Sequence, residues 1–324
     1  MFKDKPIFTR FDLSLPDRIW NEVKREGDIC NSFRCHFSQI CPFQNAKREW
    51  ADSDILIMNH YLFFTNVAFD KLYIPDTDIV IFDEAHSVEN IGAAQLGFKI
   101  SNHDLLEILG LFYTGKKRNQ LINNISSAQK RKDCIELIKD IQKESSVFFE
   151  HMKSKSKGRE LRITEPLPVG EILSNNLKRL NIILQDTEAD FVSDEFVQME
   201  FDIFRGKLFL YTENFRNFIY HSKDNFVYWI ESIDRDLLAE VNLRGQPIDI
   251  TETMYSEVMT YYTSNIFISA TLTINKDFSF IEKRLNVINH KTLLLESTFN
   301  FKEQVKLYIS SNLDNAKDTQ FIQK

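Results

Sequence analysis

A chain of 324 residues is long enough for about two domains, each with its own hydrophobic core, which excludes a disulfide miniprotein. Hydrophobic residues make up 43% of the sequence and charged residues 27%, with only 9 Gly and 7 Pro, which excludes a collagen-like chain or a disordered linker. The formal net charge of −7 means that any contact with nucleic acid has to come from local basic patches.

The sequence carries no membrane or secretion signal. No run approaches the ~18 consecutive apolar residues of a membrane helix, and the opening MFKDKPIFTRFDLS lacks the apolar centre of a signal peptide. We therefore expect a cytoplasmic protein without a membrane partner. In that reducing compartment, closely spaced cysteines favour metal or redox chemistry over disulfides. Three of the four cysteines, Cys30, Cys35 and Cys41, lie within one short segment.

The first predicted strands lie before residue 83. Residues 1–50 have an irregular pattern with short helical pieces, and the apolar run Ile55–Met58 has the length of a strand. Residues 78–82, DIVIF, are apolar on both faces, which is typical of a buried parallel strand. They run directly into the tetrapeptide Asp-Glu-Ala-His at 83–86. Since ligands of open α/β sheets bind where strands end, the sequence predicts a functional site here.

The pattern becomes helical after this point. Between about residues 99 and 222, apolar residues recur at three- and four-residue spacing, most clearly at 105–109, 135–141 and 173–180. Strand-like apolar runs then return at 226–230, 266–268, 293–295 and 305–309. We therefore expect a helical insertion, after which the sheet begun before residue 83 resumes beyond residue 225.

The tetrapeptide at 83–86 has the residue types that ATP hydrolysis needs. Asp83 would hold a nucleotide-bound magnesium ion, directly or through water, and Glu84 would orient and deprotonate the water that attacks the γ-phosphate. His86 would report the nucleotide state to the rest of the protein. The alternative is an incidental string at a helix start, where acidic residues suit the helix dipole.

Asp83-Glu84-Ala85-His86 is motif II of DEAH-type helicases, and Ser269-Ala270-Thr271, also after a predicted strand, resembles their motif III. The long helical stretch between the two motifs lies where helicases of the XPD/DinG type insert an arch domain. The spacing Cys30-x4-Cys35-x5-Cys41 matches the last three cluster ligands of DinG-like helicases. The chain therefore resembles XPD/DinG-type iron-sulfur DEAH-box DNA helicases, and the DinG-like members most of all.

The resemblance implies an α/β fold that contains part of a RecA-like P-loop NTPase motor domain, a partial iron-sulfur domain and a large helical arch insertion. The partial iron-sulfur domain would occupy residues 1–50, and the motor domain with motif II would occupy 51–98. The arch-like insertion would span 99–222. Residues 223–324 would return to the motor domain, with motif III and the start of the link to a second motor domain. The stretch FVYWIE at 226–231 also looks like this family.

The implied cofactors are a [4Fe-4S] cluster, magnesium and ATP. Four thiolates hold such a cluster, because soft sulfur ligands suit iron-sulfur chemistry. Cys30, Cys35 and Cys41 would supply three of them, and the family's first ligand would lie upstream of Met1. Cys134, in the helical pattern CIELIKDI, is interpreted as a buried structural thiol. Zinc bound by the same three cysteines stays open as an alternative.

A helicase of this type also needs a phosphate-binding loop of the form G-x4-G-K-[ST]. The stretch 110–117, GLFYTGKK, comes near, but Lys117 replaces the hydroxyl residue and the stretch follows a helical pattern. We interpret it as unrelated to nucleotide binding. The chain is therefore expected to be an internal fragment without this loop and without the second motor domain, with a second polypeptide as a candidate partner for the missing parts.

The function implied is that of an ATP-dependent DNA helicase that couples ATP hydrolysis to 5′–3′ movement on single-stranded or forked DNA in DNA repair or replication, this chain being inactive alone. Candidates for DNA contact are the basic residues Lys155, Lys157 and Arg159, and the pair Asn59 and His60. Solvated helix faces are the simpler account of the basic residues.

Two other functions stay open. A non-catalytic module would grip single-stranded DNA or a partner without turning over ATP. A metal-dependent hydrolase would use Asp83, Glu84 and His86 as ligands or acid–base groups, although adjacent Asp and Glu on a strand-to-helix turn point in different directions.

Overall fold

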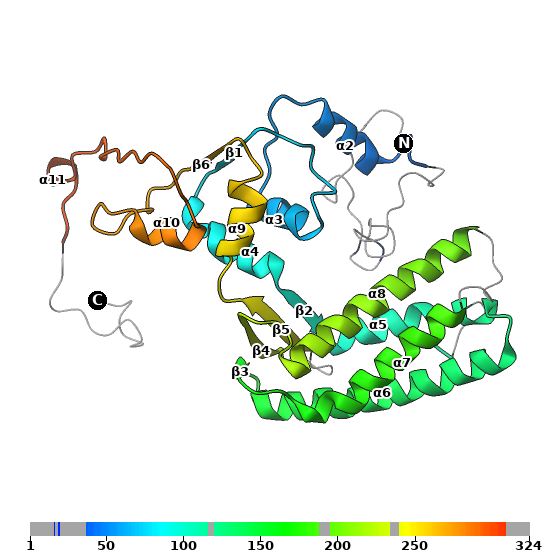
Figure 1. Ribbon diagram of the computed structural model, residues 1–324. Coiled ribbons are helices and arrows are strands. Elements are labelled where there is room, and N and C mark those ends of the chain that lie inside the picture. Colours follow the sequence, from blue (N-terminus) through cyan, green and yellow to red (C-terminus); the bar gives the residue numbers. More distant parts are fainter. Residues whose placement is uncertain are drawn as a thin grey trace.

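The computed structural model describes residues 16, 19, 37–115, 120–187, 195–233 and 240–308. The protein is mixed α/β, with two separate hydrophobic cores that each carry their own sheet (Figure 1). We name the part built by residues 58–96 and 250–287 the parallel unit, and the part built by residues 98–247 the helical unit. The second is inserted in the chain between the two halves of the first.

The parallel unit is built on two strands, β1 (Ile79–Phe82) and β6 (Ser264–Phe267), which pair in parallel with Ile81 opposite Ile266. Its helices are α3 (His60–Ala68), α4 (Val88–Leu96), α9 (Thr251–Met254) and α10 (Ser279–Leu285), with the short helix η3 (Ala85–Ser87) and the π-helix η7 (Tyr255–Met259). Two further helices, α2 (Pro42–Ala51) and α11 (Phe301–Gln304), lie outside its core.

The two faces of the parallel sheet differ in burial. Phe82 is 1% exposed, and its ring stacks on that of Phe267 at a centroid distance of 5.2 Å. On the opposite face, Ile79 and Ile81 are 57% and 59% exposed, and Ile266, opposite Ile81, is 41% exposed. Parallel sheets usually have both faces covered. This sheet therefore presents one packed face and one apolar face that is open to solvent.

The helical unit combines four long helices with a four-stranded antiparallel sheet, and three of them, α5, α6 and α8, contact the sheet. The helices are α5 (Asn102–Phe112), α6 (Ala128–Ser156), α7 (Glu171–Thr187) and α8 (Glu195–Tyr220), with the short helices η4 (Leu121–Asn124) and η5 (Pro168–Gly170). The strands, in spatial order, are β2 (Phe98–Ser101), β5 (Glu240–Pro247), β4 (Phe226–Ile233) and β3 (Leu161–Ile163). Figure 1 shows the four helices running alongside one another, with this sheet near one end.

The passage from β2 into α5 shows how the sequence sets these boundaries. The hydroxyl of Ser101 accepts the backbone N–H of Asp104 at 3.1 Å, and the Asp104 carboxylate accepts the backbone N–H of Ser101 at 2.7 Å. This capping box satisfies two N–H groups at the helix start that would otherwise lack partners. Leu105, Leu109 and Phe112 follow at helical spacing and are fully buried. A cap and an apolar stripe therefore define α5.

The helical periodicity predicted from sequence is confirmed, because residues 105–109, 135–141 and 173–180 lie in α5, α6 and α7. The strand predicted at 226–230 also exists, as β4. It pairs with β3 and β5 in the antiparallel sheet, so this run does not belong to the sheet begun before residue 83. The parallel sheet resumes at β6, which confirms the expectation that the first sheet resumes beyond residue 225. Strand β4 joins the antiparallel sheet because Tyr228 and Ile230 bury their side chains among the helices of the insertion.

Three other predicted strands are not found in the described part of the chain. Residues 55–58, 293–295 and 305–308 belong to no strand or helix. Ile55 and Ile57 are 80% and 92% exposed, and Leu293 and Leu295 are 77% and 78% exposed. These apolar runs lack the neighbouring strand that a hydrogen-bonded ladder requires. No helix within the described ranges has the length and apolar character needed to cross a membrane.

The two cores predict a separable response to mutation. Phe82→Ala should destabilise the parallel unit by ~3–5 kcal/mol, the usual effect of emptying a buried aromatic site. Phe112→Ala is the matched change in the helical unit, because Phe112 is equally buried and stacks on Phe204 at 4.5 Å. Amide hydrogen exchange read by mass spectrometry should show faster exchange in α3 and α4 for the first variant and in α5 and α8 for the second. Equal acceleration in both units by either variant would contradict separate cores.

Candidate functional site

The candidate site begins at the turn that follows β1. Glu84 adopts the left-handed conformation, with φ of 49°, which is uncommon for a residue other than glycine. Asp83 supports this turn, since its Oδ1 accepts the backbone N–H of Glu84 at 2.9 Å. The next residue, Ala85, is fully buried and donates its N–H to the carbonyl of Ile268 at 2.9 Å. The turn is therefore fastened to the neighbouring strand, with both acidic side chains outside the core.

His86 joins this turn to the segment after β6. Its Nδ1 lies 2.8 Å from Oγ of Ser269, a hydrogen bond between residues 183 positions apart in sequence. The same Nδ1 lies 3.3 Å from Oε2 of Glu84. Ser269 Oγ also accepts the backbone N–H of Thr271 at 3.2 Å. One imidazole nitrogen therefore faces a carboxylate on one segment and a hydroxyl on the other.

The parallel pairing of β1 and β6 explains why these segments meet. The ladder continues past both strands, because Ile268 donates its N–H to the carbonyl of Phe82 at 2.9 Å. Parallel strands end at the same edge of their sheet, and that edge is where ligands of open α/β sheets bind. The side chains of Glu84 and His86 are 65% and 49% exposed at this edge. They are accessible to a ligand from solution.

Two further predicted residues lie beside this turn but do different things. Asn59 caps α3, because its Oδ1 accepts the backbone N–H of Leu62 at 2.8 Å. His60 places Nδ1 3.2 Å from the hydroxyl of Ser87, and that hydroxyl donates to the carbonyl of Glu84 at 2.9 Å. Sequence reasoning missed Ser87, although its position directly after the tetrapeptide was available as a signal. Contact of Asn59 and His60 with DNA stays a prediction.

The predicted basic residues lie in the helical unit, away from this turn. Lys155 is in the last turn of α6, and Lys157 ends that helix in the left-handed conformation, with φ of 50°. Cations near a helix C-terminus interact favourably with the helix dipole, which is a structural role sufficient for both. Arg159 follows in the turn after the helix, its backbone N–H donating to the carbonyl of Ser156 at 3.0 Å. Their contact with DNA stays a prediction.

The four cysteines divide into two groups. Cys30 and Cys35 lie outside the described residues, and Cys41, partly buried and free, occupies the position before the first turn of α2. Cys134 is fully buried in the larger core, where burial raises the pKa of its thiol to about 11. That environment fits the interpretation of Cys134 as a structural thiol. Within the described ranges, no group of three or more His, Cys, Asp or Glu residues is arranged to hold a metal ion.

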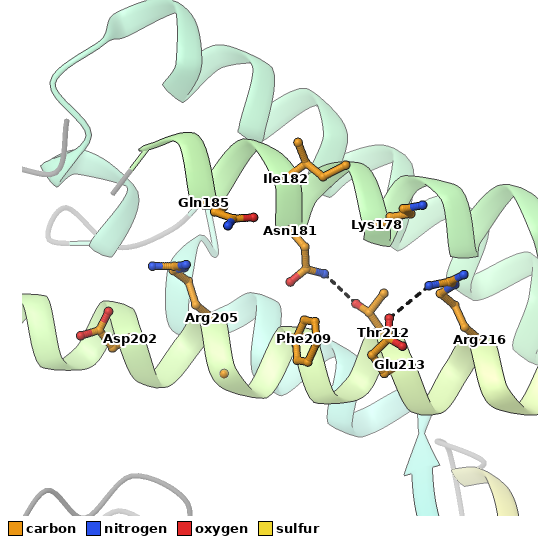
Figure 2. Close-up of a pocket in the computed structure, with 11 residues that line it drawn as sticks. Lys178, Asn181, Ile182, Gln185, Asp202, Arg205, Phe209, Thr212, Glu213 and Arg216 are labelled. Carbon is orange, nitrogen blue, oxygen red and sulfur yellow. Dashed lines mark hydrogen bonds and ion pairs between the residues drawn. The ribbon is translucent and has the colours of Figure 1, made fainter. Parts of the chain in front are cut away.

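A pocket of about 610 Å³ lies in the helical unit, between α7 and α8. Figure 2 shows Asn181 reaching from α7 to the hydroxyl of Thr212 on α8, to which it donates at 2.8 Å. Lys178 and Phe209 line the same pocket from the two helices. None of the residues predicted from sequence to carry function lies in it.

The glycine-containing stretch at 110–117 begins in a helix and not in a loop, since Gly110 lies inside α5.

Comparison with known proteins shows which proteins this chain resembles. Residues 16–105 match the family model described as DEAD_2. The chain is 24% identical over 329 residues to the ATP-dependent DNA helicase YoaA of Escherichia coli (strain K12), an alignment that covers 96% of this chain and 47% of that protein. The chain is a relative of the DinG-like helicases. The resemblance inferred from the sequence motifs is confirmed.

Two proteins of another organism are similar to this chain over most of its length. The 3'-5' exonuclease DinG of Bacillus subtilis (strain 168) is 24% identical over 356 residues, which cover 96% of this chain and 38% of that protein. The probable ATP-dependent helicase YpvA of the same organism is 20% identical over 321 residues, which cover 94% of this chain and 47% of that protein. The chain therefore spans less than half the length of these relatives.

The contact between His86 and Ser269 can be tested by a double-mutant cycle. His86→Ala and Ser269→Ala should each reduce the free energy of unfolding in urea, and the double variant should lose less than their sum by ~0.5–1.5 kcal/mol, the net contribution of a typical hydrogen bond. His103→Ala is the control, because His103 lies in α5 of the helical unit and should combine additively with Ser269→Ala. Additive losses for His86 and Ser269 would contradict this contact.

Proposed function

We propose that the chain is the DEAH-containing part of an ATP-dependent DNA helicase, in which Asp83 holds the magnesium ion of bound ATP and Glu84 activates the attacking water. The observation that carries this proposal is the hydrogen bond between His86 and Ser269, which joins the DEAH turn to the segment Ser269–Thr271 at the ends of two adjacent parallel strands. The helicase names of its relatives support the reaction class.

The residues of the turn fit a nucleotide-bound magnesium ion. Magnesium in such sites takes one or two protein carboxylates, with phosphate and water oxygens as its other ligands, so a cage of several protein ligands is unnecessary. Asp83 is exposed at the end of β1, and among the described residues only one of its two oxygens is engaged, by the N–H of Glu84. When bound, the ion would neutralise charge on the phosphates. The contribution of the chain is to hold the carboxylate at the strand end.

Glu84 and His86 would have different roles: Glu84 would accept a proton from water, and His86 would report hydrolysis to the segment after β6. The left-handed turn directs the Glu84 side chain away from the core, where it can accept a proton from a water molecule beside the phosphate. His86 Nδ1 carries at most one proton, so it can donate to the Glu84 carboxylate or to Ser269, or accept from the Ser269 hydroxyl. A change in charge at Glu84 would therefore alter the hydrogen bond between His86 and Ser269, which is how hydrolysis would be reported to the segment after β6.

The wider assignment follows the same family. We propose that the parallel unit belongs to a RecA-like motor domain and that the helical unit is the arch insertion, with its boundaries at 98–247 because β4 and β5 belong to its sheet. Residues 1–50, with Cys30, Cys35 and Cys41, would be part of an iron-sulfur domain, whose cluster would fix a small fold that has little core of its own. Movement along single-stranded DNA in the 5′–3′ direction, in DNA repair, is part of this proposal.

The catalytic proposal predicts the behaviour of Glu84→Gln. In a reconstituted full-length helicase that contains this chain, the variant should lose ATP hydrolysis by at least about a hundred-fold while nucleotide binding is kept, because the amide cannot take the proton of water. Glu107→Gln in α5 is the matched control and should hydrolyse ATP normally. Hydrolysis at the wild-type rate by Glu84→Gln would contradict the proposed role. DNA binding without any hydrolysis by the wild type would favour a non-catalytic binding module.

The cluster proposal predicts the metal content of the anaerobically purified chain. Cys35→Ser should lose most of the bound iron and the visible absorption of a cluster, because one thiolate ligand is removed. Cys134→Ala should keep both, because Cys134 is buried in the core of the helical unit. Iron and absorption are measured by elemental analysis and spectroscopy. Full iron content in Cys35→Ser would contradict the assignment, and zinc in place of iron in the wild type would favour the zinc alternative.

A further inference from the structure

One face of the antiparallel sheet carries a row of four side chains that crosses every strand. Lys99 on β2 pairs with Arg244 on β5, Arg244 pairs with Trp229 on β4, and Trp229 pairs with Arg162 on β3. Residues directly opposite one another in an antiparallel pair have side chains on the same face of the sheet. Three cations and one indole therefore form a continuous row.

This row lies on the face away from the helices. Alternate residues of a strand point to opposite faces, and the sequence neighbours of the row point into the core. Those neighbours are Ile100, Leu243, Ile230 and Ile163, which are all buried in the core of the helical unit. Arg162 is exposed, and the side chains of Lys99 and Arg244 are 43% and 36% exposed.

A single carboxylate orients the centre of the row. Glu231 accepts the indole N–H of Trp229 at 3.0 Å with Oε1 and the Nε–H of Arg244 at 2.7 Å with Oε2. Arg244 meets this carboxylate through Nε, and within the part of the chain that the structure describes its two terminal nitrogens remain for another acceptor. The indole and the guanidinium are thus held in fixed positions before any ligand arrives, which lowers the entropy lost on binding.

The edge strand β3, which carries Arg162, borders a second pocket. Arg162 lines a pocket of about 320 Å³ together with Lys155 and His151, which project from α6. Glu165 is the acidic residue in that lining. At a strand spacing of about 4.8 Å, the row itself spans roughly 14 Å from β2 to β3. Cations therefore lie on both sides of Trp229 over a length that accommodates several nucleotides.

We propose that this sheet face, consisting of Lys99, Arg162, Trp229 and Arg244, binds single-stranded DNA, with a base stacked on Trp229 and phosphates bound by Arg162 and Arg244. Sites for single-stranded nucleic acid combine aromatic platforms with cations that follow the backbone, and guanidinium groups match phosphate geometry. The choice of DNA rests on the proposed function. The sheet face itself is separate from the DEAH turn.

The charges on this face indicate which cation matters most. Glu240 pairs with Lys99 at 3.4 Å, and Glu231 pairs with Arg244, so these two cations are partly neutralised. Arg162 sits opposite Trp229 on the edge strand β3, and its neighbours in the pocket include the cationic side chain of Lys155. We therefore expect reversal of charge at Arg162 to weaken binding more than reversal at Lys99.

The test measures binding of the whole chain to a fluorescently labelled oligodeoxythymidylate of about 20 nucleotides by anisotropy. Trp229→Leu should weaken binding by at least about five-fold, the lower end of what loss of one base–aromatic stack costs. Trp229→Phe should stay within about two-fold of the wild type, because it keeps an aromatic face. Both variants lack the indole N–H that bonds Glu231. Equal weakening by both would therefore assign Trp229 a structural role and overturn the stacking proposal.

Charge reversal supplies an independent arm. Arg162→Glu should weaken binding and reduce the slope of log affinity against log salt, by about 0.7 for each phosphate of a single strand that the arginine neutralises. Lys178→Glu is the matched control, because Lys178 is an exposed cation in the pocket between α7 and α8 and should leave both unchanged. If the wild type binds and both Trp229→Leu and Arg162→Glu bind as tightly as the wild type, the proposed DNA site on this sheet face is overturned. The proposed function would not be affected by that result. A wild type that binds no single-stranded DNA would overturn both.

Discussion

The parallel pairing of β1 with β6 is the constraint on which the candidate site depends. Their ladder runs on into the turn, where Ala85 donates a backbone hydrogen bond to Ile268, and it brings His86 within 2.8 Å of Ser269. Parallel strands cannot be joined by a tight turn and need a long crossover connection. Here the crossover holds the entire helical unit. The geometry at residues 83–86 therefore depends on an insertion whose two ends lie close together, so that the chain can return to the parallel unit.

The antiparallel sheet of the insertion meets this requirement. The chain enters the helical unit through β2 and leaves through β5, and these two strands are hydrogen-bonded neighbours with Phe98 opposite Gly245. A side chain at Gly245 would collide with the ring of Phe98, so glycine permits the close approach at this point. Because entry and exit lie side by side, the many residues between them add little strain to the β1–β6 pair. Loop-closure entropy also grows only slowly with loop length.

The sequence predicted what depends on local pattern and missed what depends on distant partners. The turn at 83–86 and the helices α5, α6 and α7 follow from a strand pattern, a motif and a period of 3.6 residues, all visible within one segment. The partner of β4 is not visible in that way, because an apolar run such as FVYWIE shows that a strand is buried but not against which sheet. The exposed runs at 55–58 and 293–295 show the same limit, as strand-like composition forms no strand without a neighbour.

Helix α4 connects the two proposed binding sites. It begins directly after Ser87, which bonds the DEAH turn, and it ends one residue before β2, which carries Lys99. At 1.5 Å per residue its nine residues span roughly 13 Å. Near its middle, an added Cβ at Gly92 would lie 2.7 Å from Ile250, the residue before α9, and 3.0 Å from Phe64 of α3, so α4 is closely packed there. Since α4 is closely packed near its middle, a displacement of the DEAH turn along the helix axis would reach β2, the edge strand of the sheet face for which we propose DNA binding.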